Sequence, residues 1–270
     1  MLIDTHTHLL SKKYIKTTEE IIEDAFNNDV TKIINIGCNF IEIENALNIA
    51  RNFSNVYATA GLYPHLKKFD KYLEFSLDEK IQLLEEYAKN PKVVAIGECG
   101  LDYSEPNPEI EEKVNKEDQI ELFVKQIELA KTINKPIIIH SRDALDDTLE
   151  ILNNYFCGDN LNGVWHCFSY DMQIFEKVKN LGFMISVGGL VTYSSLKDLK
   201  NVVKNMPLES LLLETDAPYL IPSQAKNQGL NINEPQYIKI IAEYIAKIRN
   251  EDYFEIEAQT TNNAERLFQI

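Results

Sequence analysis

Eight apolar runs alternate with amphipathic stretches along the 270 residues, and this alternation predicts an α/β fold with a parallel sheet. The runs are almost continuously apolar, as expected for parallel strands that are covered on both faces. Eight such units favour a closed TIM-type (β/α)8 barrel, which typically needs about 250 residues. We therefore expect one barrel domain over residues 1–270, with an extra C-terminal helix.

The expected strands lie at residues 2–9, 31–37, 55–62, 92–98, 135–140, 163–167, 183–187 and 211–214. The first helix is expected to begin near Thr17, because Thr17 and Glu20 have capping-box spacing and apolar residues then recur at helical intervals. Further helices are expected at residues 42–52, 77–89, 118–133, 143–155, 171–181, 194–205, 235–248 and 254–268, with long loops at 104–116 and 222–234. No glycine-rich phosphate fingerprint follows the first strand, which argues against a dinucleotide-binding sheet.

The five histidines of the chain gather near the ends of the expected strands. His6 and His8 stand two residues apart on one strand, so their side chains point to the same face, about 7 Å apart. Two imidazoles this close can hold one divalent metal ion, although an isolated pair is more often a surface feature. Other polar groups near strand ends are His65, Glu98, His140, His166, Glu214 and Asp216. Because the chemistry of a barrel sits at the C-terminal ends of its strands, we expect these groups around one mouth.

Four of these histidines and two of the carboxylates are enough to bind two metal ions. One ion is assigned to His6, His8 and Asp216, and the second to His140 and His166. Glu98, on the strand between these groups, is expected to place one oxygen on each ion. Two ions about 3.5–4 Å apart can activate a bridging water and polarise the bond under attack. The imidazoles favour zinc, while the carboxylates leave magnesium or manganese possible.

The expected catalytic residues are the two carboxylates Glu98 and Asp216. Asp216 follows the strand at 211–214 directly, so it is expected to bind an ion and to accept the proton of the attacking water. A neighbouring dication should keep the pKa of this carboxyl low. The alternative role of Asp216 is a cap on the loop into Pro218. Glu214 is expected to orient a histidine and not to bind a third ion.

The net charge of −15 argues against a broad basic surface for gripping duplex DNA. No apolar run approaches the roughly 20 residues of a membrane-spanning helix, and the N-terminus has no secretory signal pattern. The four cysteines contain no C-x-x-C pair and are expected to be reduced intracellular thiols. The sequence therefore predicts a cytoplasmic protein with no membrane association, and nothing in it points to an obligate protein partner.

Five motifs in order from the first strand to the last helix resemble those of the TatD-like metal-dependent deoxyribonucleases. They are DTHTH at 4–8, GECGLDY at 97–103, PIIIHSR at 136–142, LETDAPY at 213–219 and TTNNAERLF at 260–268. Each motif alone is moderately specific, and together they are strong. The resemblance implies an amidohydrolase-like TIM barrel, a two-metal site and hydrolysis of DNA phosphodiester bonds. It also implies metal roles that agree with the assignment above, for His6, His8, Glu98, His140, His166 and Asp216.

Two stretches depart from the family pattern. The family usually carries Gly-x-His-Pro-His after the third strand, whereas here Tyr63 replaces the first histidine and His65 remains as an expected substrate contact. The family often carries Arg and Lys before Asn-Glu-Pro, whereas here only Lys226 precedes Asn233. Fewer cations imply a weaker hold on DNA. Arg142, two residues after His140, is expected to bind a substrate phosphate bidentately, and its alternative is a salt bridge at the strand end.

The leading hypothesis is a two-metal nuclease that cuts DNA, with single strands or ends favoured because a flexible strand enters a barrel mouth more easily than a duplex. The alternative is a two-metal hydrolase of a small ester, amide or phosphoester, which would suit the acidic charge. A metal-bearing binding scaffold without turnover is a third hypothesis. The complete set of six metal ligands argues against it, because a scaffold has no need for an open two-metal site.

Overall fold

The computed structural model describes residues 1–67, 74–105, 111–156 and 163–270. One of the four cysteines, Cys157, and part of the expected loop at 104–116 lie outside the described residues. Cys38, Cys99 and Cys167 form no disulfide. No helix in the described ranges is long and apolar enough to cross a membrane.

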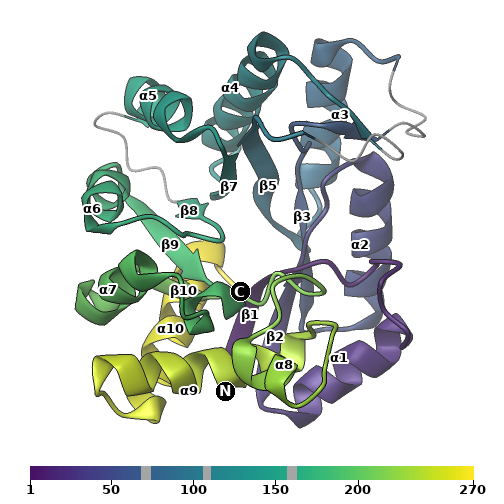
Figure 1. The fold of residues 1–270 in the computed structure, drawn as a ribbon. Coiled ribbons are helices and arrows are strands. Elements are labelled where there is room, and N and C mark those ends of the chain that lie inside the picture. The colour runs from purple at the N-terminus through teal and green to yellow at the C-terminus, as the bar shows by residue number, and fades with distance from the viewer. Residues whose placement is uncertain (68–73, 106–110, 157–162) are drawn as a thin grey trace.

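Eight parallel strands form the centre of the fold and confirm the predicted barrel (Figure 1). In the order in which they pair they are β1 (Leu2–Thr7), β2 (Val30–Asn35), β3 (Val56–Ala60), β5 (Val93–Asp102), β7 (Ile137–Arg142), β8 (Gly163–Trp165), β9 (Phe183–Val187) and β10 (Leu211–Leu213). Every neighbouring pair in this order is parallel. Their apolar sequences fit burial on both faces.

The first and last strands almost close the barrel. The Thr5 hydroxyl donates to the Leu213 carbonyl at 2.8 Å, and a parallel bridge joins Thr7 to Ala217. The amide of Asp216 donates to the His6 carbonyl at 2.9 Å. The N-terminal strand and the turn after β10 therefore lie side by side, although about 200 residues separate them in the sequence.

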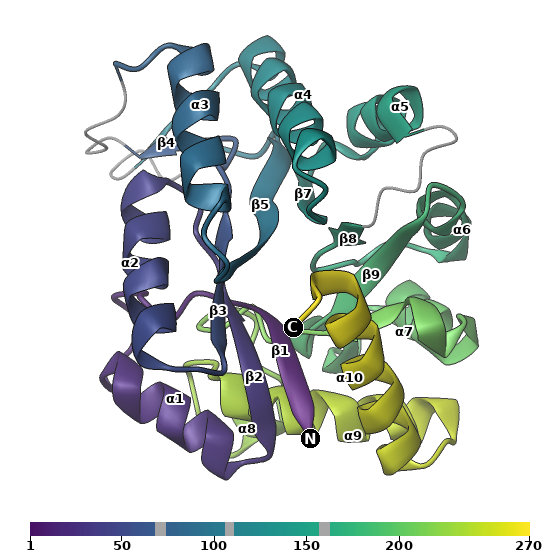
Figure 2. The ribbon, with the colours of Figure 1, turned by 180° about the vertical axis from the view of Figure 1, so that it is seen from behind.

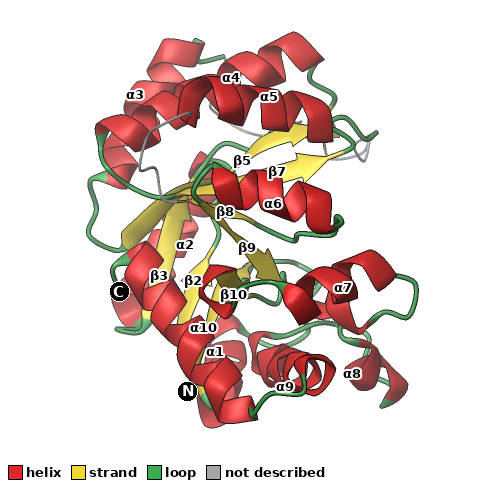
Figure 3. Cartoon of the chain, turned by 90° about the vertical axis from the view of Figure 1, so that its left-hand side faces the viewer, coloured by secondary structure: helices red, strands yellow, loops and turns green. Residues whose placement is uncertain are grey.

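The helices surround the strands on the outside, as Figures 1 and 3 show. They are α1 (Thr18–Asn27), α2 (Phe40–Asn52), α3 (Leu77–Ala88), α4 (Lys116–Thr132), α5 (Leu145–Phe156), α6 (Met172–Asn180), α7 (Lys197–Asn205), α8 (Ser223–Asn227), α9 (Ile238–Arg249) and α10 (Tyr253–Phe268). The capping box predicted at Thr17 and Glu20 is present. The helix expected from residue 118 begins at Lys116, because Asn115 accepts a hydrogen bond from the Asp118 amide and caps it.

Both expected long loops contain short regular elements that the sequence did not predict. α8 lies within the loop expected at 222–234. The two-residue strands β4 (Leu66–Lys67) and β6 (Glu111–Glu112) pair antiparallel, the latter inside the loop expected at 104–116. Three short 3-10 segments occur at Gly189–Thr192, Leu208–Ser210 and Pro235–Tyr237. Elements of this length carry too few residues to show a periodic pattern.

The strand expected to end at Glu98 continues to Asp102, which corrects the sequence prediction. Between Ile96 and Cys99, β5 advances three residues while β7 advances two, from Ile137 to Ile139. Such a bulge redirects the extra residue of the longer strand. Gly97 makes it possible, because its φ is +139° and a Cβ there would lie 2.7 Å from the Ile138 carbonyl oxygen. The bulge turns Glu98 into the site.

The end of the barrel opposite the site is filled by apolar side chains. Early strand residues such as Ile3, Val164 and Leu212 form one buried cluster with Leu267 and Phe268 of α10. Figure 2 shows α10 running past the start of β1. The expected extra C-terminal helix thus packs at the N-terminal end of the barrel, where barrel residues contribute to stability, and leaves the other end for chemistry.

Candidate metal centre

A cavity of about 540 Å³ opens at the C-terminal ends of the strands. Its lining includes six of the residues that the sequence singled out, namely His8, Glu98, His140, Arg142, His166 and Asp216. His6 lies beneath them and is buried. The alternation of a strand explains two of these positions, because His140 and His166 stand two residues after the interior side chains Ile138 and Val164.

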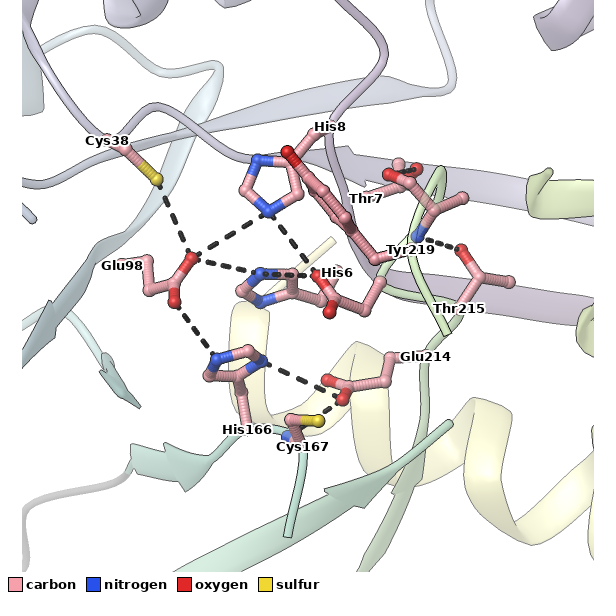
Figure 4. A network of polar contacts seen from close by, with 12 residues as sticks. His6, Thr7, His8, Cys38, Glu98, His166, Cys167, Glu214, Thr215 and Tyr219 are labelled. Atoms are coloured by element: carbon pink, nitrogen blue, oxygen red, sulfur yellow. Dashed lines mark hydrogen bonds and ion pairs between the residues drawn. The ribbon is translucent and has the colours of Figure 1, made fainter. Parts of the chain in front are cut away.

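Glu98 is the central group of the site. Its Oε2 lies 3.2 Å from His6 Nε2 and 3.8 Å from His8 Nε2. Its Oε1 lies 2.7 Å from His140 Nδ1 and 3.0 Å from His166 Nε2. The carboxylate is buried, and Figure 4 shows it between His8, His6 and His166. Each oxygen therefore faces a different pair of imidazoles.

Asp216 approaches the first of these pairs from the other side. Its Oδ1 lies 3.4 Å from His8 Nε2 and 3.8 Å from His6 Nε2. The backbone at Asp216 has a φ of +52°, an uncommon conformation that aspartate tolerates better than most residues, and its amide bonds to the His6 carbonyl. The turn after β10 therefore holds this carboxylate against the histidines of β1.

Two groups of donors in the described residues are spaced to hold a metal ion. One is His6, His8 and Asp216, and the other is His6, Glu98 and His166. His140 joins the second group through its Nδ1, 3.3 Å from His166 Nε2. His6 belongs to both groups, so the donors form one continuous cluster. The six ligands expected from the sequence are thus all brought together.

The hydrogen bonding and protonation of His6 and Glu98 suit metal binding. Among the described residues, both ring nitrogens of the buried His6 lack a well-directed hydrogen bond, which is costly unless they bind something. Burial lowers the pKa of His6 and so favours the neutral imidazole. Burial would raise the pKa of the Glu98 carboxyl, but the charge of His166 and a hydrogen bond with His140 hold it well below its usual range. Neutral imidazoles and ionised carboxylates are the forms that bind metal, so His6 and Glu98 are ready to bind. Burial lowers the pKa values of His8, His140 and His166, but nearby carboxylates outweigh it and raise them, so a metal ion at these histidines would displace protons.

A second layer of contacts orients His140. The Tyr63 hydroxyl donates to Asp102 Oδ2 at 2.7 Å and lies 3.1 Å from His140 Nε2. Asp102 Oδ2 itself lies 3.4 Å from His140 Nε2, and Oδ1 accepts from the amide and the hydroxyl of Ser104. Tyr63, which replaces the family histidine, therefore holds the far side of this ring. Such partners fix which nitrogen of a ligating histidine faces the metal.

A similar contact supports His166, as expected for Glu214. The buried Glu214 accepts hydrogen bonds from the Cys167 amide at 2.7 Å and from the Ser186 hydroxyl. Its Oε1 lies 3.7 Å from His166 Nδ1 (Figure 4). The carboxylate is thus tied to β9 and the turn after β8, and it faces the side of His166 away from Glu98.

Two contacts of the site were not anticipated from the sequence. Asp4 accepts hydrogen bonds from the amide of Thr215 at 2.9 Å and from its hydroxyl at 2.6 Å, and its burial raises its pKa to about 8. The Cys38 thiol donates to Glu98 Oε2 at 3.6 Å. In both cases the two residues are far apart in the sequence and meet across strands. No local spacing in the sequence predicts such a contact.

The two expected substrate contacts have different surroundings. Arg142 is exposed and lines the cavity, and its guanidinium makes no ion pair or hydrogen bond within the described part of the chain. His65 is buried, is absent from the lining of this cavity, and accepts a hydrogen bond at Nδ1 from the Val114 amide at 3.5 Å. Tyr63, two residues earlier, lines the cavity in its place. The alternative role of Arg142, a salt bridge at the strand end, is not found among the described residues.

Comparisons with known proteins show the family of the chain. The chain matches the model of the family described as TatD related DNase over residues 3–269. The uncharacterized metal-dependent hydrolase YabD of Bacillus subtilis is 37% identical over 270 residues, which cover 100% of both chains. The protein of Salmonella typhimurium named 3'-5' ssDNA/RNA exonuclease TatD is 32% identical over 274 residues, which cover 100% of this chain and 99% of that protein.

A solved structure has the same fold. The crystal structure of YjjV, a TatD homologue from Escherichia coli K12, superposes with a TM-score of 0.85 at 31% identity and covers 100% of this chain and 98% of that one. The family match covers nearly the whole chain, the barrel fold matches, and side chains at the mouth of the barrel are spaced to hold a metal ion. The chain therefore belongs to the TatD-related DNase family of metal-dependent hydrolases.

Proposed function

We propose that this protein is a nuclease that hydrolyses phosphodiester bonds of single-stranded DNA with the help of two divalent metal ions. The observation that carries the proposal is the position of Glu98 between two histidine pairs. Its Oε2 is 3.2 Å from His6 Nε2, and its Oε1 is 2.7 Å from His140 Nδ1. A carboxylate with one oxygen turned to each pair is suited to bridge two ions.

These distances support one division of the ligands between the two ions. One ion is assigned to His6, His8, Asp216 and Glu98 Oε2, and the other to His140, His166 and Glu98 Oε1. Four imidazoles favour zinc, and the two carboxylates leave magnesium or manganese as alternatives. Such ions would polarise the phosphodiester and make water a nucleophile at neutral pH.

Asp216 is the proposed base. Burial would raise the pKa of its carboxyl, but a hydrogen bond with His8 holds that pKa below its usual value. The carboxylate is therefore ionised and can accept the proton of the attacking water at Oδ1 or Oδ2. Asp216 would then pass this proton towards the oxygen of the leaving strand.

Arg142 is the proposed phosphate contact. It is exposed at the cavity and has no competing acidic partner among the described residues, so its five N–H groups are available to a substrate phosphate. Arg142→Ala should lower kcat/KM on DNA about 10- to 100-fold, the size of a lost charge-assisted hydrogen bond, with no change in metal content. An unchanged kcat/KM would mean that Arg142 has no role in substrate binding.

Single-stranded DNA is proposed as the substrate for two reasons. A relative that matches the whole chain is named a 3'-5' ssDNA/RNA exonuclease. The net charge of −15 disfavours the extended phosphate contacts that a duplex requires, whereas one flexible strand can thread its end into a cavity of about 540 Å³. We expect digestion from the 3' end, by analogy with that relative.

The acidic charge also supports a second candidate, a hydrolase of a small ester, amide or phosphoester. The metal cluster would serve either reaction. Assays of the zinc-, magnesium- and manganese-loaded protein on end-labelled single-stranded and duplex DNA, beside a panel of small esters, separate the two. We expect loss of nucleotides from the single strand, abolished by a chelator and restored by metal. Turnover of the esters with intact DNA would refute the nuclease and support the second candidate.

A further inference from the structure

Tyr219 is an aromatic side chain held at the rim of the metal-site cavity. It lines the cavity, yet 41% of its surface remains exposed. Its ring meets that of the candidate ligand His8 edge to face, with centroids 5.8 Å apart and an interplanar angle of 82°. Figure 4 shows the two rings next to each other. The ring therefore faces both the proposed reaction centre and solvent.

The backbone that carries Tyr219 is firmly anchored. The Tyr219 amide donates to the Asp216 carbonyl at 2.9 Å, so both residues belong to one tight turn. The side chain of Asn233, itself fully buried, donates to the carbonyls of Tyr219 at 2.7 Å and Thr215 at 2.8 Å. These bonds fix the position of the ring relative to the Asp216 carboxylate. An exposed ring at a fixed distance from a reactive centre is a suitable platform for binding.

A cation already occupies one face of this ring. Lys13 Nζ lies over the ring at 3.9 Å from its centroid. The Lys13 side chain is exposed and belongs to the loop after β1, so it can leave this position at little cost. A flat aromatic group could take the same place, because base stacking on an aromatic side chain is stronger than an exposed cation–π contact. The displaced ammonium would remain close enough to contact a phosphate.

We propose that Tyr219 and Lys13 form a nucleobase subsite for the nucleotide next to the bond that is cut. The inference rests on the proposed nuclease function and adds how the strand is held. The base stacks on Tyr219, Lys13 moves from the ring to the backbone phosphate, and Arg142 on the same cavity contacts the phosphate at the reaction centre. DNA and RNA bases present the same aromatic faces, so the subsite accepts both, whereas a small aliphatic ester gains nothing from it.

The test uses the metal-loaded full-length protein and a short 5'-labelled oligothymidylate. In two matched substrates a tetrahydrofuran abasic residue replaces the nucleotide on one side or the other of the terminal phosphodiester. Wild-type protein should cleave the intact strand more efficiently than one of these, by roughly 5- to 150-fold in kcat/KM, the usual contribution of one stacked base. The difference should appear mainly in KM, because stacking holds the substrate as well as the transition state.

Two variants separate stacking from packing. Tyr219→Leu removes the aromatic plane and should bring the intact and abasic substrates to equal kcat/KM, while Tyr219→Phe keeps the ring and should keep the difference. Metal content, measured for each variant, should not change. A difference that persists in Tyr219→Leu, or that is absent in the wild-type protein, overturns the subsite and leaves the nuclease proposal standing. Absence of any cleavage by the wild-type protein overturns both.

The phosphate contact of Lys13 is tested separately, by the salt dependence of substrate binding. Lys13→Gln removes one proposed phosphate contact, so the slope of log(1/KM) against log salt concentration should become shallower by about 0.7, the value for one phosphate on a single strand. Lys12→Gln changes the neighbouring exposed lysine, which does not lie over the Tyr219 ring as Lys13 does, and serves as the control. Equal slopes for wild-type protein and Lys13→Gln would remove Lys13 from the subsite.

Discussion

At the scale of single residues, Asp216 is proposed to act both as a metal ligand and as the base. Its Oδ1 faces both His8 and His6, at 3.4 and 3.8 Å, and its backbone is bonded to the strand that carries them. The carboxylate is therefore placed both to bind an ion and to take a proton. An asparagine has nearly the same shape and one weaker oxygen donor, but it cannot act as a base.

Asp216→Asn should fold normally and keep at least the ion assigned to His140 and His166. We expect kcat to fall on the order of 10²–10⁴-fold, the usual contribution of general acid–base catalysis. Steady-state kinetics on single-stranded DNA, together with metal analysis, measure this. Asp198→Asn, on the exposed surface of α7, is the control and should leave kcat unchanged. Near wild-type turnover in a metal-replete Asp216→Asn protein would remove the proposed base.

The donors of the site could be predicted because metal binding restricts the choice of side chain. Histidines and carboxylates that recur at strand ends indicate a metal site in the sequence itself. The structure brings all six expected ligand side chains together. The hydrogen bonds from Tyr63 to Asp102 and from Thr215 to Asp4 could not be predicted. They depend on how distant strands align, and one sequence does not contain that information.

At the scale of elements, the bulge in β5 decides where Glu98 points. Gly97 has a φ of +139°. Gly61, the residue after β3, packs against it so closely that a Cβ on Gly61 would lie 2.3 Å from the Gly97 carbonyl carbon. The strand is therefore held between two neighbours that leave no room for a side chain. This packing ties the position of the Glu98 carboxylate to the geometry of the sheet.

Gly97→Ala should damage both stability and metal binding. A Cβ would lie 2.7 Å from the Ile138 carbonyl oxygen in a conformation that alanine disfavours, so we expect the free energy of unfolding to fall by about 1–3 kcal/mol. Zinc affinity should fall about 10- to 100-fold as Glu98 is displaced. Chemical denaturation and zinc titration measure the two effects.

Gly229→Ala provides the matched control for this prediction. Gly229 also has a positive φ, +85°, but a Cβ there would meet no atom of the described residues within 4 Å. This variant should lose some stability through backbone strain and keep its zinc affinity. Equal zinc affinities of Gly97→Ala and the wild-type protein would show that the bulge does not position Glu98.

The elements themselves could be predicted where a pattern is long. Eight apolar strands and the long helices follow from periodicity, while α8 and the pair β4–β6 span only a few residues each. The continuation of β5 to Asp102 escaped prediction because the bulge breaks the alternation at Gly97 and Glu98. The apolar run ends there, although the hydrogen-bonded strand does not.

At the scale of the whole molecule, the barrel separates stability from chemistry. Apolar side chains and the end of α10 fill one end, and the candidate metal-binding cluster with its cavity occupies the other. Within α10, Asn263 is buried and donates to the carbonyls of Leu208 and Leu211, both at 2.8 Å, which ties the helix to the start of β10. Changes at the filled end should therefore alter stability more than metal binding.

Phe268→Ala tests this separation. Phe268 is buried in the cluster at the filled end, so its removal should lower the free energy of unfolding by about 3–5 kcal/mol in chemical denaturation. Phe254 lies on the same helix but is 70% exposed, and Phe254→Ala should change the free energy by no more than about 0.5 kcal/mol. Both proteins should keep wild-type metal content. Loss of metal in folded Phe268→Ala would contradict the separation.

Glu98 is proposed to bridge two metal ions at the mouth of the barrel. Anomalous diffraction from crystals of the zinc-loaded protein tests it most directly. We predict two anomalous peaks about 3.5–4 Å apart, one beside His6, His8 and Asp216 and one beside His140 and His166, with one oxygen of Glu98 on each. In crystals of Glu98→Ala both peaks should weaken. A single peak in the wild-type protein, or two undiminished peaks in Glu98→Ala, would contradict the claim.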